Sequence, residues 1–258
     1  MTATAARPST EHDADLALRL AERAGGLLLA ARDGGELGGR ALADEGDRLA
    51  QEFLAAELEA TRPDDAVLSE EAPDQLARLS ASRVWIIDPL DGTREYAEGR
   101  HDWAVHVALW EDGDLVAGAV ALPARGRVFS TADPGELPSR PTGPLQVAVS
   151  RTRPPEQAQW LVDDMGAQLV PMGSAGYKAM AVLLGEVDAY VHAGGQYEWD
   201  SAAPVAVARA AGLHTSRVDG SALDYNQAEP WLPDLVVCRP EAAERIIAVT
   251  GRGAQPTR

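Results

Sequence analysis

Apolar residues recur every three or four positions in the first sixty residues, which is the spacing of an amphipathic helix. The pattern predicts a helix over residues 11–32. Its buried stripe would contain Leu16, Leu20, Ala24, Leu27 and Leu28. The paired glycines between residues 34 and 39 predict a flexible loop. A second helix is predicted to begin near Asp47 and to end before Pro63.

Short apolar runs follow the two predicted helices and indicate β-strands. They cover Ala66–Ser69, Val84–Ile87, Ala104–Trp110 and Leu115–Leu122. Asp112 and Gly113, a common turn pair, separate the last two runs. These two runs are therefore predicted to form an antiparallel hairpin.

A stretch rich in proline and glycine, Asp133–Pro144, is the predicted boundary between two halves, residues 1–133 and 145–258. Beyond it, strand-like and helix-like segments alternate. The predicted strands are Leu145–Ser150, Leu169–Met172, Val187–His192 and Leu235–Cys238. The predicted helices begin at Pro154-Pro155, Ser174, Asp200 and about Pro240. Helices before strands in the first half, and alternation in the second, predict a layered α/β fold.

Charge and hydropathy narrow the possible partners. The formal net charge of −17 argues against a nucleic-acid duplex or an anionic membrane, because both require a basic surface. No apolar run approaches the roughly 20 residues that a membrane-spanning helix needs. An acidic protein can still bind a small phosphorylated metabolite when carboxylate-held metal ions supply positive charge.

The cysteine content and the first residues bear on the compartment. Cys238 is the only cysteine, which excludes an internal disulfide and fits a reducing environment. The polar segment Met1–Thr10 has no features of a signal peptide. We therefore expect a cytoplasmic protein.

The strongest chemical signal is the segment Asp88–Thr93, which directly follows an apolar run. Carboxylates at the end of a buried strand are expensive to bury unpaired, and a metal ion removes that cost. Asp88 and Asp91 can turn toward one point, and the turn between them can expose the Leu90 carbonyl as a further oxygen ligand. The segment therefore predicts a metal site.

Three further features favour Mg²⁺ and phosphate chemistry. Gly92 and Thr93 would offer backbone N–H groups to a phosphate at the start of a short helix. Glu70 follows a predicted strand, and Asp200 opens a predicted helix. Mg²⁺ prefers oxygen ligands and retains several waters, so a few carboxylates around a phosphate-sized gap suit it.

Three segments in this order resemble the inositol monophosphatase superfamily: Glu70-Glu71, Asp88–Thr93 and Trp199–Pro204. The resemblance covers the chain from about residue 11 onward. It implies a layered αβαβα sandwich, Mg²⁺-dependent phosphomonoesterase activity through metal-activated water, inhibition by Li⁺, and a homodimer. Within the superfamily, residues 69–71, 173–178 and 194–200 look most like the actinobacterial CysQ-type 3′-phosphoadenosine-5′-phosphate phosphatases.

The resemblance also implies a role for each matching residue, with two or three Mg²⁺ ions in the site. The implied ligands of the first ion are Glu70, Asp88 and the Leu90 carbonyl. The implied ligands of the second ion are Asp88, Asp91 and Asp200. Glu71 would orient water or bind a weaker third ion.

The resemblance implies that Asp47 and Thr93 are the catalytic pair, which together would take a proton from the attacking water. This chain departs from the family beside that pair. It has Asp44 where the family often has threonine, three residues before the acid.

Substrate contacts are predicted for a group of residues around the motifs: Gly92, Thr93, Ser174, Lys178, Gln196 and Tyr197. An ordinary surface charge is an equally good interpretation of Lys178, the only lysine of the chain. Inositol phosphatases typically have glutamate seven residues before the downstream metal-binding aspartate, whereas this chain has Ala193.

Tyr197 and Trp199 could stack a nucleobase at the rim of the site, which favours a nucleotide over a sugar. We therefore predict hydrolysis of 3′-phosphoadenosine 5′-phosphate to AMP and phosphate, a clearing step in sulfate assimilation. Fructose 1,6-bisphosphate and inositol phosphates are the alternative substrates.

Two other classes compete with this interpretation. Haloacid dehalogenases also contain Asp-Gly-Thr, but their nucleophilic aspartate stands two residues before the position of Asp91, where this chain has Pro89. A metal-binding regulatory protein without activity is the other alternative, and it gains no support because every expected ligand position retains its acid.

Overall fold

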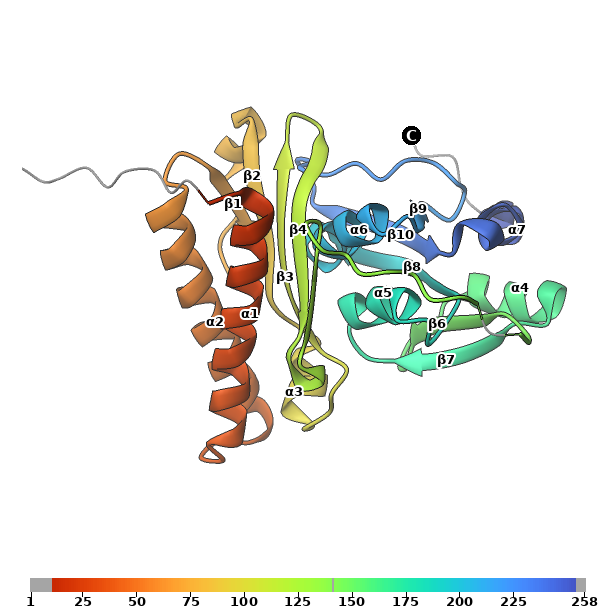
Figure 1. Ribbon diagram of the computed structural model, residues 1–258, viewed down its shortest axis with the longest axis horizontal. Coiled ribbons are helices and arrows are strands. Elements are labelled where there is room, and N and C mark those ends of the chain that lie inside the picture. The colour runs from red at the N-terminus through yellow and green to blue at the C-terminus, as the bar shows by residue number, and fades with distance from the viewer. Residues whose placement is uncertain (1–10, 141, 254–258) are drawn as a thin grey trace, which may run out of the picture.

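Helices and sheets form five layers, helix–sheet–helix–sheet–helix, which follow one another along the long axis of the molecule (Figure 1). The computed structural model describes residues 11–140 and 142–253, so the segment used to predict the absence of a signal peptide lies outside the described residues. This layering confirms the predicted α/β sandwich. None of the helices in the described ranges combines the length and apolar character that crossing a bilayer requires.

The first layer consists of α1 (Asp13–Asp33) and α2 (Gly39–Thr61), which pack on one face of the first sheet (Figure 1). The predicted helix α1 is confirmed with its buried stripe, except for Leu27, which is 40% exposed. The predicted start of α2 near Asp47 is wrong by two helical turns. Leu42 is already buried and lies in phase with Ala50, Leu54 and Leu58, so the amphipathic face extends back to the glycines.

The first sheet has the strand order β1-β2-β3-β4-β5. Its strands are β1 (Ala66–Ser69), β2 (Arg83–Asp91), β3 (Ala104–Glu111), β4 (Asp114–Leu122) and β5 (Arg127–Ser130). β1 is parallel to β2, and the other pairs are antiparallel, which confirms the β3–β4 hairpin. β5 was not predicted. β2 continues through the motif acids, with a register shift against β3 between Asp88 and Asp91, and the short helix α3 (Thr93–Ala97) follows.

The second sheet has the order β7-β6-β8-β10-β9. Its strands are β6 (Gln146–Ser150), β7 (Gln168–Met172), β8 (Ala189–Tyr197), β9 (His214–Ser216) and β10 (Trp231–Cys238). The helices of this half are α4 (Glu156–Met165), α5 (Ala175–Leu183), α6 (Glu198–Ala210) and α7 (Pro240–Thr250). Short 3₁₀ turns cover Leu76–Ser80, Pro123–Arg125 and Gly251–Gly253. β9 was not predicted, and β10 begins four residues earlier than predicted.

The middle layer joins the halves. α5 and α6 lie between the two sheets, while α4 and α7 cover the outer face of the second sheet (Figure 1). Gly118 of β4 allows α6 to approach closely, because a Cβ there would lie 2.8 Å from the Cβ of Ala206. The start of α6 and the start of α5 thereby come to lie beside the end of β2.

Candidate active site

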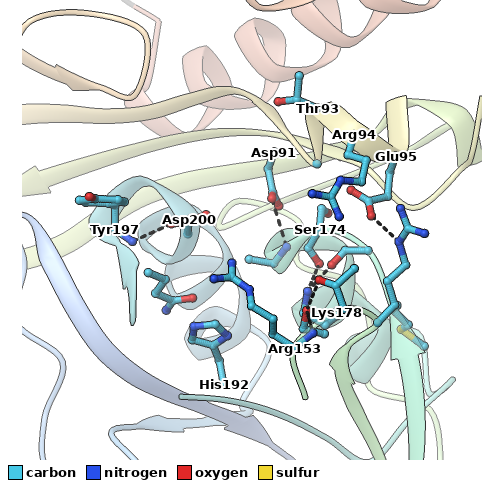
Figure 2. A pocket seen from close by; sticks show the side chains of 18 of the residues that line it. Asp91, Thr93, Arg94, Glu95, Arg153, Ser174, Lys178, His192, Tyr197 and Asp200 are labelled. Carbon is cyan, nitrogen blue, oxygen red and sulfur yellow. Dashed lines mark hydrogen bonds and ion pairs between the residues drawn. The ribbon is translucent and has the colours of Figure 1, made fainter. Parts of the chain in front are cut away.

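One pocket of about 630 Å³ lies where the end of β2, the starts of α3, α5 and α6, and the end of β8 meet (Figure 2). Both halves of the chain contribute to its wall. The wall contains both carboxylates and cationic side chains. In Figure 2, the side chain of Arg153 extends from below toward Asp91 and Asp200.

Three carboxylates form a cluster at the pocket: Asp91 and Asp200 line it, and the buried Asp88 does not. Oxygen atoms of Asp88, Asp91 and Asp200 all lie within 4.8 Å of one another, a spacing that could hold a metal ion. Asp88 is only 1% exposed, and burial together with the charges of Glu70, Asp91 and Asp200 raises its pKa well above the usual value. Burial and Asp91 raise the pKa of Asp200 to about 6. Crowded carboxylates of this kind favour a bound cation.

Asp200 owes its position to the start of α6. Its Oδ2 accepts a hydrogen bond of 2.6 Å from the backbone N–H of Tyr197, so the side chain caps the helix, as its place in the sequence suggested. A backbone hydrogen bond also positions the Asp88 side chain, since its Oδ1 accepts from the N–H of Leu90 at 3.0 Å.

Asp91 differs from the other two carboxylates because a histidine contacts it and two backbone N–H groups of another helix donate to it. It accepts hydrogen bonds from the N–H of Ala175 at 3.1 Å and of Gly176 at 2.6 Å, at the start of α5. Burial alone would raise the pKa of Asp91, but His106, Lys178 and the Gly176 N–H outweigh it and lower the pKa. Asp91 therefore ties the end of β2 in the first half to a helix of the second half.

His106 of β3 is a site residue that the sequence did not reveal. It is fully buried, its Nε2 lies 3.1 Å from Asp91 Oδ2, and its Nδ1 lies 3.0 Å from the Trp199 carbonyl. Gly176 leaves room for the ring, since a Cβ there would lie 2.0 Å from Nε2. The only local signal is a histidine inside an otherwise apolar strand.

Glu70 and Glu71 separate in space. Glu70 lines the pocket, and burial together with Asp200 and Asp91 raises its pKa to about 7. Glu71 instead lines an adjoining hollow together with Asp44 and Asp47. Glu71 lies outside the cluster of three carboxylates, so a role in orienting water or binding a third ion stays a prediction.

Thr93 connects the pocket to Asp47. Its hydroxyl lies 3.1 Å from the Leu90 carbonyl and 3.5 Å from Asp47 Oδ1. Gly46 makes this approach possible, because a Cβ there would lie 2.9 Å from the Tyr96 ring and hold α2 away. Burial and the charge of Glu71 raise the pKa of Asp47 to about 7, which is suitable for a group that accepts protons near neutral pH.

Lys178 lies in the pocket and not on the surface, so the surface interpretation is wrong. It is 4% exposed, and its Nζ donates to the carbonyls of Gly173 and of Ser174, the latter at 2.8 Å. Burial lowers its pKa to about 8 even though Asp91 lies close by. Ser174 caps α5 by accepting from the Tyr177 N–H at 3.0 Å.

Three arginines of the wall were missed by the sequence analysis. Arg151 pairs with Glu95 and Glu98 at 2.6 and 2.7 Å. The side chains of Arg94 and Arg153 line the pocket and form no ion pair within the described ranges. Two cationic groups are therefore free to meet an anionic ligand.

Gly92, Gln196 and Tyr197 also line the pocket, as Figure 2 shows for Tyr197. Gly92 has φ +88°, and a Cβ there would lie 2.8 Å from Ser174 Cβ, so the chain needs glycine at this point. Trp199 stacks on Tyr197 with ring centroids 4.7 Å apart and is not part of the pocket wall. Of the two aromatic residues predicted at the rim, Tyr197 lines the pocket, whereas Trp199 does not and packs one face of its ring on Tyr197. Stacking of a base by this rim stays a prediction.

These features agree with the comparisons with known proteins. The model of the inositol monophosphatase family matches residues 11–254, and the chain belongs to this family. The protein is 53% identical to the 3′-phosphoadenosine 5′-phosphate phosphatase of Mycobacterium leprae over 253 residues, 92% of this chain and 93% of the relative. It is 30% identical to the 3′(2′),5′-bisphosphate nucleotidase CysQ of Escherichia coli K12 over 186 residues, 68% and 76% of the two chains.

The fold is shared with solved structures. CysQ from Bacteroides thetaiotaomicron superposes with a TM-score of 0.78 at 24% identity, covering 88% of this chain and 97% of that one. Inositol monophosphatase II from Staphylococcus aureus MSSA476 gives a TM-score of 0.78 at 19% identity, over 92% and 95% of the two chains.

Proposed function

We propose that the protein is a Mg²⁺-dependent phosphatase that hydrolyses 3′-phosphoadenosine 5′-phosphate to AMP and inorganic phosphate. The observation that carries the proposal is that a carboxylate cluster and arginines without an ion pair among the described residues meet at one pocket. The names of the mycobacterial and enterobacterial relatives support the substrate.

The carboxylate cluster fits Mg²⁺. Asp88, Asp91 and Asp200 supply hard oxygen ligands, and Glu70 and the Leu90 carbonyl would complete the set. Burial and, after it, the charges of neighbouring carboxylates raise the pKa values of Asp88 and Asp200, and a divalent cation would offset both effects. Bound there, Mg²⁺ would lower the pKa of water and neutralise charge on the transferring phosphoryl group.

The protein's own proton acceptor would be Asp47, acting through Thr93. The Thr93 hydroxyl already lies between the Leu90 carbonyl and Asp47. In its deprotonated form, Asp47 can accept the hydroxyl proton while Thr93 accepts a proton from the attacking water. Because water attacks phosphorus directly, no phosphorylated residue is required.

The cationic part of the pocket would bind the second phosphate. A substrate with phosphates at both ends of a ribose needs positive charge at two places, and the carboxylates with their metal ions would serve only the 3′ end. Arg153 and Arg94 form no ion pair in the part of the chain that the structure describes, and Lys178 lies beside them in the same pocket. Guanidinium groups suit phosphate because they donate two parallel hydrogen bonds.

Several expectations accompany this proposal through the family resemblance. They are a role in sulfate assimilation, inhibition by Li⁺, a homodimer and a cytoplasmic location. Their tests are Li⁺ titration of the activity, light scattering and cell fractionation.

Product analysis tests the proposal. Incubation of 3′-phosphoadenosine 5′-phosphate with the protein and Mg²⁺ should yield AMP and phosphate, separated by ion-exchange chromatography. Formation of adenosine 3′-phosphate instead would mean that the two phosphates bind in the opposite orientation.

A further inference from the structure

One part of the pocket wall has no role in the phosphate chemistry described so far, although it includes Gln196, a predicted substrate contact. It consists of Gly195 and Gln196 at the end of β8 and Trp231 at the start of β10, here called the β8–β10 wall. The two strands are antiparallel, with Trp231 opposite Tyr197 and Leu232 opposite Gln196.

Trp231 is 46% exposed although it is one of the largest apolar side chains of the molecule. Its indole rests on the backbone of Gly195, since a Cβ there would lie 2.4 Å from Nε1 and 2.8 Å from Cε2. Gly195 has φ +97° and the preceding Gly194 has φ +100°, so both positions favour glycine for conformational reasons as well. The chain therefore bends to support an indole whose surface remains available to a ligand.

Gln196 provides the second observation. Its side chain is 6% exposed, yet neither the amide nitrogen nor the amide oxygen has a hydrogen-bond partner among the described residues. Burying such a group unpaired costs about 1–3 kcal/mol, so a ligand that pairs with it would remove a penalty. An amide offers one donor and one acceptor side by side, the complement of the adenine edge with its N6 amino group and N7.

We propose that the β8–β10 wall is the subsite for the nucleobase of the substrate. The indole of Trp231 stacks on the face of the purine, and the amide of Gln196 pairs with its polar edge. This inference rests on the proposed function, because it places the base beside a phosphate held at the carboxylate cluster. It assigns the stacking role to Trp231, which lines the pocket, and not to Trp199, which lies outside the pocket wall.

Binding of the product AMP provides a test that does not depend on turnover. AMP should quench the tryptophan fluorescence of the wild-type protein, and Trp231→Phe should abolish most of this change. The matched control is Trp160→Phe, which removes a partly buried indole of α4 outside the pocket and should retain the quenching. Equal quenching in wild-type protein and Trp231→Phe would overturn the inference.

Steady-state kinetics provide the second test. Trp231→Ala should lower kcat/KM for 3′-phosphoadenosine 5′-phosphate about 5- to 150-fold, chiefly through KM, because stacking is worth about 1–3 kcal/mol per base. Trp231→Phe should recover much of the loss. Gln196→Leu should cause a loss of about tenfold. With fructose 1,6-bisphosphate, which has no base, Trp231→Ala and Gln196→Leu should each lose much less kcat/KM than with the nucleotide. Equal fold losses on the two substrates would refute a base subsite.

The two proposals can fail separately. If a sugar phosphate is the better substrate while AMP still quenches Trp231, the proposed substrate is wrong and the base subsite stands. If the nucleotide is preferred and substitution of Trp231 changes neither binding nor kinetics, the proposed function stands and the subsite is wrong.

Discussion

The carboxylate cluster predicts opposite effects for two substitutions that look alike, Asp88→Asn and Asp91→Asn, in the metal-free protein. Asp88 accepts one backbone hydrogen bond, which an asparagine oxygen can keep, and its charge is opposed by Glu70, Asp91 and Asp200. Asp91 accepts two backbone hydrogen bonds and contacts His106. Asp88→Asn should therefore stabilise the metal-free protein, and Asp91→Asn should destabilise it.

The magnitudes follow from the spacing. Two like charges about 4.8 Å apart repel by roughly 3 kcal/mol at an effective dielectric constant of about 20. Asp88 can relieve part of this by taking up a proton, so Asp88→Asn should raise the free energy of unfolding by about 1–2 kcal/mol, or about 2–8 °C in Tm. Asp91→Asn weakens charge-assisted hydrogen bonds worth about 1.5–3 kcal/mol and should lower Tm by a similar amount.

The assay is thermal unfolding of wild-type protein and both variants, in EDTA and in excess Mg²⁺. Mg²⁺ at 100 times its Kd should stabilise the wild type by about 2.7 kcal/mol, and both variants should lose most of that gain. The reasoning is refuted if Asp88→Asn lowers Tm in EDTA as much as Asp91→Asn does. It is also refuted if Mg²⁺ stabilises Asp88→Asn as strongly as the wild type.

Three further predictions concern proton transfer, substrate charge and the buried lysine. Thr93→Ala should lower kcat about 100-fold or more with little change in KM, and a change confined to KM would show that Thr93 does not take part in proton transfer. In the wild type, the acidic limb of the pH–rate profile should have a midpoint no higher than about 7. This limb should disappear in Asp47→Asn. Arg153→Gln should lower kcat/KM about 10- to 100-fold for 3′-phosphoadenosine 5′-phosphate but hardly for adenosine 3′-phosphate, and equal losses would contradict a second phosphate site. Lys178 is the only lysine, so selective isotope labelling gives a single NMR signal, which should titrate near pH 8 in the metal-free protein. The pKa of lysine in the unfolded chain is about 10.5, so the unfolded state binds more protons between pH 8 and 10.5, and Lys178 should add to the free energy of unfolding as pH rises over this range. An NMR titration midpoint near 10.5 would contradict burial of Lys178 and show that it is in contact with water.

Sequence reasoning was most successful where the chemistry is local. Asp88–Thr93 indicates a metal and phosphate site because two acids at the end of a buried strand are costly to bury unless a cation binds them. The alternation of apolar runs predicted the layered fold and nearly all helices and strands. The errors were at boundaries, such as the start of α2, and at the short edge strands β5 and β9, whose three or four residues carry little periodicity.

The rest of the pocket depends on which segments meet in space. His106 becomes a partner of Asp91 only through the register of β2 against β3 and the gap left by Gly176. Trp231 enters the wall through the pairing of β10 with β8, strands that lie far apart along the chain. Nothing local in the sequence distinguishes Arg153 from the other arginines of the chain. Their positions follow from tertiary packing, for which the sequence carries no local signal.

The most direct test of the central claim is phosphate release from 3′-phosphoadenosine 5′-phosphate, fructose 1,6-bisphosphate and inositol 1-phosphate, with Mg²⁺ and with EDTA. We predict activity only with Mg²⁺ and a kcat/KM for the nucleotide at least about tenfold above the other two, or roughly 1.4 kcal/mol of transition-state preference. A higher kcat/KM for fructose 1,6-bisphosphate or inositol 1-phosphate than for the nucleotide, or full activity in EDTA, would contradict the account.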